Sequence, residues 1–274
     1  MSFIESLIYG FISGLSEFMP VSTQGHQALM LRLFGLSVRE PGRDVFVHIG
    51  ILLALVSACR TMFNHVMTKQ RVTVNTRRGR RVERRSTYDL QLVKAALVPM
   101  ILGLFGYLAA RKIENNMAWL AVLFVLNGII VMVTEYTRRG NKDGRFMSGW
   151  DSIALGLFGA LSALPGVSRN ATMHFYTTMR GVDRSHSLNW FFLLSVPALI
   201  LFILFDIVNL FILPLGTVTF ISFLWYLVSA AAAFLGAQLS ISFVRYLSVH
   251  MGYAGFAYFS WGAAMFSFVL YLIV

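Results

Sequence analysis

The chain has 274 residues, of which 57% are hydrophobic and only 13% are charged, with a mean hydropathy of +0.69. A soluble domain carries about 25% charged residues, so this composition excludes an ordinary soluble domain and a disordered chain. The net charge of +11 does not indicate nucleic-acid binding, because eight of the 23 basic residues lie between Lys69 and Arg85, beside an apolar segment. Such a run is typical of a cytoplasmic loop that faces anionic lipid head groups.

The first apolar stretch, residues 3–35, is interrupted by the polar sequence Pro20-Val21-Ser22-Thr23-Gln24-Gly25-His26. A full membrane span needs about 20 apolar residues, and each flank of this break has about half that length. Two structures fit the pattern. One is a pair of short surface helices, and the other is a re-entrant helix–turn–helix hairpin. Irregular backbone at membrane depth is tolerated only where protein or a wet cavity surrounds it.

The rest of the chain contains six stretches long enough to span a membrane and a second broken stretch. The spans are predicted at approximately 44–64, 92–110, 117–137, 187–208, 218–240 and 253–274. Residues 152–179 are broken by Pro165-Gly166-Val167-Ser168-Arg169-Asn170. Because apolar runs of this length are not typical of β-barrels, we expect one all-α integral membrane domain, 1–274, with six transmembrane helices and two re-entrant hairpins.

The two broken stretches are related by an internal repeat. At an offset of 146 residues five identities occur, namely Gly10 with Gly156, Leu15 with Leu161, Ser16 with Ser162, Val21 with Val167 and Ser22 with Ser168. Broken segments at corresponding positions of two halves indicate a binding site where the halves meet. We therefore expect pseudo-repeats at approximately 1–137 and 150–274.

The distribution of basic residues predicts the orientation of the chain. If the run at 69–85 is cytoplasmic, 17 basic residues face the cytoplasm. The outer side then holds five, namely Arg32, Arg39, Arg43, Arg111 and Lys112. This bias follows the positive-inside rule. It places both termini outside and makes the two hairpins enter from opposite sides, which is an inverted topology.

Ionisable residues inside a membrane are costly and are therefore functional candidates. The candidates are Glu17, His26, Asp44, His48, Arg169, His174 and Asp206. An arginine beside hydroxyl groups and helix-end N–H groups suits a phosphate, and a carboxylate with a histidine suits acid–base chemistry or a divalent cation. The structural alternatives are an ion pair between Glu17 and Arg169, an interfacial His26, and helix-packing roles for His48 and Asp206.

Four motifs in this chain resemble those of the bacterial undecaprenyl-diphosphatase family of the BacA/UppP type. They are Gly14-Leu15-Ser16-Glu17-Phe18-Met19-Pro20-Val21-Ser22-Thr23-Gln24-Gly25-His26, Asp44-Val45-Phe46-Val47-His48-Ile49-Gly50, Pro165-Gly166-Val167-Ser168-Arg169-Asn170-Ala171-Thr172 and Phe192-Leu193-Leu194-Ser195-Val196-Pro197. The motifs occur in family order over essentially the whole chain. The chain departs from the family pattern where Ser13 replaces the first of two acids, and at Thr23, Gln24, Asn170 and Ala171.

The resemblance implies an enzyme of the bacterial inner membrane that hydrolyses a polyprenyl diphosphate to the monophosphate and so recycles the cell-envelope lipid carrier. Bacitracin resistance would follow from that chemistry. The implied catalytic residues are Glu17, Thr23, His26 and Arg169, and the implied phosphate-binding residues are Ser22, Gln24, Gly25, Ser168, Asn170 and Thr172. Glu17 would also bind a divalent cation, Mg²⁺ or Ca²⁺. The sequence leaves a homodimer open.

A second hypothesis is a carrier that binds without hydrolysis. Inverted repeats with broken helices are a transporter architecture. A chain that has lost one acid at Ser13 could still hold a lipid phosphate through Arg169 and move undecaprenyl phosphate across the bilayer. The retained set of Glu17, His26 and Arg169 favours the enzyme.

Overall fold

The computed structural model describes residues 1–36, 39–68, 70–76, 79–85, 87–110, 115–212 and 219–273. Some basic residues used above to predict the orientation lie outside the described residues, namely Lys69, Arg77, Arg78, Arg111 and Lys112.

The described chain is almost entirely helical, and its elements follow the predicted apolar stretches. The helices are α1 (Phe3–Phe18), α2 (Thr23–Leu33), α3 (Pro41–Ala58), α4 (Arg60–Met67), α5 (Tyr88–Leu104), α6 (Gly106–Ala110), α7 (Met117–Tyr136), α8 (Gly149–Ala160), α9 (Arg169–Met179), α10 (Arg184–Ile212), α11 (Phe220–His250) and α12 (Ala254–Ile273), with 3-10 turns η1 (Gly144–Phe146) and η2 (Leu161–Ala163). Six segments of the described chain are long and apolar enough to cross a membrane: α3, α5 with α6, α7, α10, α11 and α12. The prediction of a multi-pass helical membrane protein is therefore confirmed.

The two broken stretches form two pairs of short helices, α1–α2 and α8–α9. In each pair a serine caps the second helix: Ser22 Oγ accepts a hydrogen bond from the Gly25 N–H (3.2 Å), and Ser168 Oγ accepts one from the Ala171 N–H (3.4 Å). Because serine is a strong N-cap, each helix resumes directly after it. The breaks are thus shorter than predicted, and Thr23 and Arg169 each occupy the first position of a helix.

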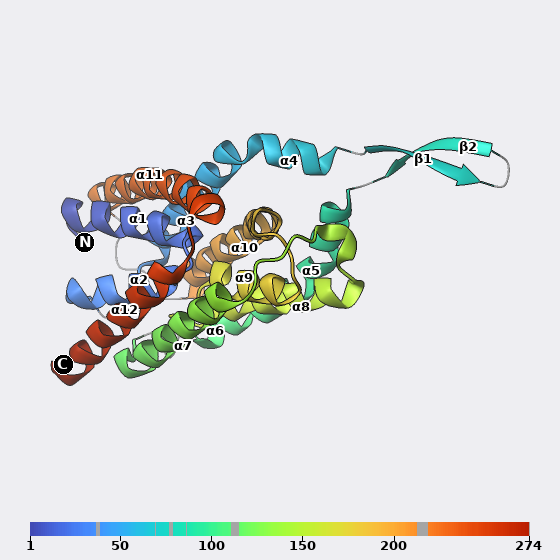
Figure 1. The fold of residues 1–274 in the computed structure, drawn as a ribbon. Helices are drawn as coiled ribbons and strands as arrows, with labels where there is room; N and C mark the ends of the chain where they lie inside the picture. Colours follow the sequence, from blue (N-terminus) through green and yellow to red (C-terminus); the bar gives the residue numbers. More distant parts are fainter. Residues whose placement is uncertain are drawn as a thin grey trace.

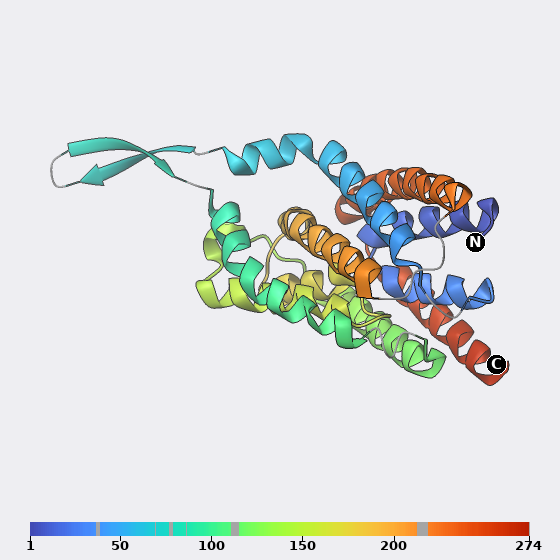
Figure 2. The same cartoon turned by 180° about the vertical axis from the view of Figure 1, so that it is seen from behind.

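The structure contains one element that the helical prediction did not include. The predicted basic loop contains a two-stranded antiparallel hairpin, β1 (Gln70–Thr76) and β2 (Gly79–Arg85), in which Gln70 pairs with Arg85 and Thr76 with Gly79. The three consecutive β-branched residues Val72-Thr73-Val74 favour a strand over a helix. The hairpin extends away from the helical body, at the end opposite both termini (Figures 1 and 2).

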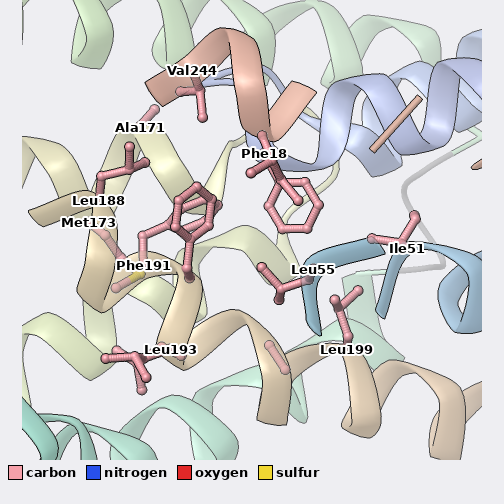
Figure 3. Close-up of a cluster of buried hydrophobic side chains, with 14 of the residues drawn as sticks. Phe18, Ile51, Leu55, Ala171, Met173, Leu188, Phe191, Leu193, Leu199 and Val244 are labelled. Atoms are coloured by element: carbon pink, nitrogen blue, oxygen red, sulfur yellow. The ribbon is translucent and has the colours of Figure 1, made fainter. Parts of the chain in front are cut away.

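The helices around the two pairs form a continuous core. Phe18 at the end of α1 packs its ring edge-on against Phe191 and Phe192 of α10, with ring centroids 6.1 and 5.8 Å apart. Figure 3 shows this cluster, in which Phe18 and Phe191 lie with Ile51 and Leu55 of α3. All four side chains are at most 1% exposed. The core therefore holds the break between α1 and α2 against α3 and α10.

Glycines allow α1 to approach α11 and α8 to approach α5 very closely. A Cβ at Gly10 would lie 2.1 Å from the Ser229 carbonyl oxygen, and one at Gly14 would lie 2.0 Å from that of Ala233. On the other pair, a Cβ at Gly156 would lie 2.2 Å from the Ala96 carbonyl oxygen. Such close backbone approach through small residues is characteristic of helix packing in membranes.

We expect Gly14→Ala to separate α1 from α11 and to destabilise the protein by about 1–3 kcal/mol, the usual cost of overpacking a close contact. The melting temperature in detergent should fall. Gly262→Ala is the matched control, because Gly262 is also helical and no atom of a neighbouring element lies within 4 Å of the position that its Cβ would take. Equal melting temperatures for the two variants would show that the close approach is not required.

Candidate functional site

The two turns that break the helix pairs touch one another. Ser22 Oγ accepts a hydrogen bond from the Gly166 N–H (2.9 Å), and Ser168 Oγ donates one to the Met19 carbonyl oxygen (3.2 Å). Asn170 Nδ2 donates to the Phe18 carbonyl oxygen (2.7 Å). Residues about 150 positions apart in sequence are therefore brought together.

Asn127 of α7 joins both turns and was not predicted. Its Oδ1 accepts from the Ser168 N–H (2.8 Å), and its Nδ2 donates to the Pro20 carbonyl oxygen and to Ser260 Oγ of α12, both at 3.0 Å. The side chain is completely buried. A carboxamide inside an otherwise apolar span is the sequence signal that points to this residue.

A cavity of about 20 Å³ lies between the two turns, enough for roughly one water molecule. Its lining comes from both pairs and from α10: Glu17, Val21, Ser22, Thr23, Gln24, Ser162, Val167, Ser168, Arg169 and Phe202. Within the described chain, Arg169 Nε and Nη1 and Gln24 Oε1 are buried without a hydrogen-bond partner. Because buried polar groups are almost always paired, these atoms indicate a place for a polar ligand.

Glu17 and Arg169 form an ion pair across this cavity. Arg169 Nη2 donates to Glu17 Oε1 at 2.5 Å, and the side chains of Arg169 and Glu17 are 4% and 8% exposed. The guanidinium also lies 5.7 Å from the centre of the Phe191 ring. A buried guanidinium keeps its charge and requires an anion, and here the N-terminal ends of α2 and α9 add partial positive charge. The predicted ion pair is present, at a position suited to binding an anion.

His26 lies on α2 beyond the cavity and does not line it. Its Nδ1 lies 2.6 Å from the Ser22 carbonyl oxygen, so Nδ1 carries the proton and Nε2 is the basic nitrogen. The ring stacks on Phe259 of α12, with centroids 5.4 Å apart, and meets the edge of Phe124 of α7. His26 is thus connected to the turn through Ser22 while its ring packs between α7 and α12.

The other predicted phosphate-binding residues divide into two groups. Ser22, Gln24 and Ser168 line the cavity, as does Thr23. The remaining three residues have local structural contacts: Asn170 donates to the Phe18 carbonyl oxygen, Thr172 Oγ1 donates to carbonyl oxygens of its own helix, and Gly25 lets the turns approach, since a Cβ there would lie 3.0 Å from the Gly166 nitrogen.

The cavity contains oxygen ligands of the kind that Mg²⁺ and Ca²⁺ prefer. Glu17 supplies a carboxylate, Thr23 supplies a hydroxyl group, and Gln24 Oε1 has no hydrogen-bond partner in the described chain, whereas Ser22 Oγ already accepts two backbone N–H bonds. The described residues contain no group of three or more His, Cys, Asp or Glu side chains placed to hold a metal. Mg²⁺ commonly uses one or two carboxylates together with substrate phosphates, so the residues fit a cation that the diphosphate helps to bind.

Ser13, which replaces an acid of the resembled motif, belongs to a separate buried network. Its Oγ donates to the Tyr9 carbonyl oxygen (2.7 Å) and accepts from Gln27 Nε2 (3.1 Å), and Arg39 Nη1 donates to Gln27 Oε1 (2.7 Å). Arg39 is only 4% exposed, although its charge was counted among the outer loops. Its other amino group donates to the Gln24 carbonyl oxygen, so the network supports the first turn of α2.

His48 and Asp206 also form a buried pair. His48 Nδ1 lies 2.9 Å from Asp206 Oδ2, which joins α3 to α10. The imidazole ring stacks on Phe202, with centroids 5.7 Å apart, and Phe202 lines the cavity. The pair therefore packs behind the cavity, in agreement with the helix-packing interpretation.

Comparison with known families identifies the family of the chain. The family model described as "Bacitracin resistance protein BacA" matches residues 6–266, which include both turns. The chain belongs to the BacA family. Among its BacA relatives, a protein named undecaprenyl-diphosphatase from Acidothermus cellulolyticus is 28% identical over 97% of this chain and 95% of its own length. Another from Carboxydothermus hydrogenoformans is 24% identical over 95% and 94%. "Undecaprenyl-diphosphatase 3" of Bacillus cereus is 26% identical over 96% and 95%.

Proposed function

We propose that this BacA protein is an undecaprenyl-diphosphatase, which adds water across the diphosphate of a polyprenyl lipid to give the monophosphate and inorganic phosphate. The observation that carries the proposal is the buried Arg169 guanidinium, whose Nε and Nη1 have no partner in the described chain and which lines a cavity at two helix N-termini. The names of the full-length relatives agree with this chemistry.

In the proposed reaction Arg169 binds the terminal phosphoryl group through its planar fork. Thr23 or Ser22 either orients the attacking water, which gives inorganic phosphate directly, or attacks the phosphorus itself, and water then hydrolyses the resulting phosphate ester on the enzyme. In both routes the bond from the terminal phosphorus to the bridging oxygen breaks, and the prenyl monophosphate leaves. His26, whose ring does not line the closed cavity, accepts the proton of the nucleophile at Nε2 after the turns have separated. Glu17 holds Arg169 in place before the substrate binds, at 2.5 Å. Charge neutralisation by pre-positioned donors is the main catalytic contribution in phosphoryl transfer.

The closed cavity must open before the reaction. At about 20 Å³ it holds roughly one water and is too small for a phosphoryl group. We therefore propose that substrate binding displaces Glu17 from Arg169 and separates the two turns. When bound, Mg²⁺ or Ca²⁺ would supply further positive charge; Glu17, released from Arg169, would hold it with the Gln24 oxygen and the diphosphate.

We further propose that α1–α2 and α8–α9 are re-entrant hairpins of an inverted repeat. The packing partners support this arrangement: α1 packs on α11, and α8 packs on α5. At the repeat offset of 146 residues, α1 corresponds to α8, and residues 88–104 of α5 correspond to residues 234–250 of α11. Each hairpin therefore packs on a helix from the opposite half, and α7 and α12, the last helices of the two proposed repeats, pack on each other.

The proposed orientation in the bacterial inner membrane has both termini outside and the β-hairpin in the cytoplasm. We expect Thr76→Cys to resist a membrane-impermeant maleimide in intact cells and to react after permeabilisation, whereas Ser2→Cys should react in intact cells. The native Cys59 is 1% exposed, so we expect it to react little with the maleimide. Labelling of Thr76→Cys from outside intact cells would show that the orientation is the opposite of the proposed one.

One experiment tests the proposed activity and distinguishes the enzyme hypothesis from the carrier hypothesis. Purified protein is given undecaprenyl diphosphate with Mg²⁺, with Ca²⁺ or with a chelator, and released phosphate is measured for the wild type and for Arg169→Ala. We expect release by the wild type and its loss in Arg169→Ala. Binding of undecaprenyl phosphate by the wild type without phosphate release under any condition would favour the carrier hypothesis.

A further inference from the structure

The cavity between the two turns has an apolar side as well as a polar one. Three of the lining residues that the structure describes are apolar, namely Val21, Val167 and Phe202. Val21 and Val167 occupy corresponding positions of the repeat and belong to the turns themselves. Phe202 comes from α10 and adds an aromatic ring to a cavity that otherwise suits an anion. Because a phosphate is bound by donors and charges, this ring indicates a ligand that also has an apolar part.

Aromatic contacts on two sides hold the Phe202 ring in place. The imidazole of His48 on α3 stacks on it, with centroids 5.7 Å apart, and the Tyr107 ring of α6 meets it edge-on at 5.2 Å. His48 is itself fixed by Asp206, which lies one turn beyond Phe202 on α10 and whose Oδ2 is 2.9 Å from His48 Nδ1. Phe202 is only 5% exposed. The ring is therefore a pre-positioned wall of the site, because its neighbours fix its orientation.

The proposed substrate has an apolar group directly beside its diphosphate. Its first isoprene unit is joined to the inner phosphorus through a single ester oxygen, so this unit lies only a few bonds from the terminal phosphoryl group. Arg169 and Phe202 line the same small cavity. When the turns separate and Arg169 binds the terminal phosphoryl group, the first isoprene unit is within reach of the Phe202 ring.

The apolar contacts continue from Phe202 to the surface of the helical body. The Tyr107 ring, which contacts Phe202, also stacks on Phe205 of α10, with centroids 6.0 Å apart. Phe205 in turn contacts Phe105, between α5 and α6, at 5.3 Å. Phe105 is 50% exposed on a predicted membrane-spanning segment. The side of the cavity that Phe202 forms is thus joined to the lipid-facing surface by apolar rings, which is the direction that a prenyl chain requires.

We propose that Phe202 contacts the first isoprene unit of the substrate and selects prenyl diphosphates over diphosphate esters that lack this unit. The inference rests on the proposed function and adds a residue that determines its specificity. The gain comes from packing of the flat ring against the double bond and the branched carbon of the unit. Arg169 binds the phosphate and Phe202 the adjacent hydrocarbon, so one cavity recognises both parts of the substrate.

The test removes the ring and compares two diphosphate esters. Dimethylallyl diphosphate has one isoprene unit, and methyl diphosphate has a single carbon in its place. Phosphate release from dimethylallyl diphosphate is measured, and the affinity for methyl diphosphate is obtained from its competition with that reaction. For Phe202→Ala we expect kcat/KM for dimethylallyl diphosphate to fall about tenfold, as for a lost apolar contact in a substrate pocket. The affinity for methyl diphosphate should not change.

Phe205→Ala is the matched control. Phe205 is also a buried ring of α10 that contacts Tyr107, but it does not line the cavity. Its substitution should leave both quantities unchanged. Phe202→Leu fills the core better than alanine and should show a smaller loss in the same direction, so it is the test if Phe202→Ala fails to fold. If the wild type acts on undecaprenyl diphosphate alone, that lipid replaces dimethylallyl diphosphate in the same comparison.

Two results would overturn the inference. Equal losses for both esters would show that the ring only shapes the phosphate pocket, and no loss for either would show that the substrate does not touch it. A wild type that releases no phosphate from any prenyl diphosphate would instead refute the proposed activity. Native mass spectrometry of bound undecaprenyl monophosphate then tests the contact separately. Weaker binding in Phe202→Leu than in Phe205→Leu supports the inference, and equal binding overturns it.

Discussion

Arg169→Lys is expected to reduce turnover of a prenyl diphosphate by a factor on the order of 10² or more, the scale seen when one pre-positioned charge-stabilising donor is lost. Lysine keeps the positive charge but loses the planar fork that binds two phosphate oxygens. In this protein Nη2 of Arg169 binds Glu17, and Nε and Nη1 remain available to bind the phosphate. A lysine at position 169 has no equivalent of this pair of donors. The measurement is kcat for phosphate release at matched protein folding.

Arg145→Lys is the control for this substitution, since Arg145 is in an exposed ion pair with Asp143 and its side chain is 66% exposed. Its turnover should equal that of the wild type. If Arg169→Lys also retained nearly normal turnover, bidentate binding of phosphate would be the wrong role for Arg169.

Asn127→Leu is expected to damage both stability and activity. It leaves the Ser168 N–H and the Pro20 carbonyl oxygen buried without their partner, at a cost of about 1–3 kcal/mol for each unsatisfied group in a folded protein. Since the turns then lose the residue that sets their separation, turnover should fall on the order of 10²-fold, as expected for a displacement of about 1 Å at a reactive centre. The melting temperature in detergent and kcat are measured together.

Thr134→Val is a suitable comparison on the same helix. Thr134 is also buried, but its hydroxyl donates only to the Ile130 carbonyl oxygen of its own helix. We expect a much smaller change in melting temperature and normal turnover. An Asn127→Leu protein as stable and as active as Thr134→Val would show that the two turns do not depend on this bridge.

The fold could be predicted from the sequence because long apolar runs have few alternatives in a membrane. All six predicted spans are present, and α7 differs from its prediction by one residue at one end. The β-hairpin was missed because charge, rather than alternation, was used to interpret the basic segment. The polar breaks were predicted too long, because Ser22 and Ser168 restart the helices directly and place the polar residues in their first turns.

The contact between Glu17 and Arg169 could also be predicted, since the two breaks were expected to form one site and two opposite charges buried there must pair. The contributions of Asn127 and Phe202 could not, because each reaches the site only through the packing of its helix against the two turns. The orientation of the His26 ring could not be predicted either. Its spacing from Ser22 places His26 on α2, but the ring position also depends on Phe124 and Phe259, which the packing of α7 and α12 brings there.

The most direct test of the central claim, that two turns from opposite halves form one phosphate site around Arg169, is an experimental structure with undecaprenyl monophosphate bound. We predict that phosphate oxygens lie within hydrogen-bond distance of Arg169 Nε and Nη1, between Ser22 and Ser168, with the cavity enlarged beyond its present 20 Å³. A phosphate bound elsewhere on the protein, with the Glu17–Arg169 pair still closed at 2.5 Å, would contradict it.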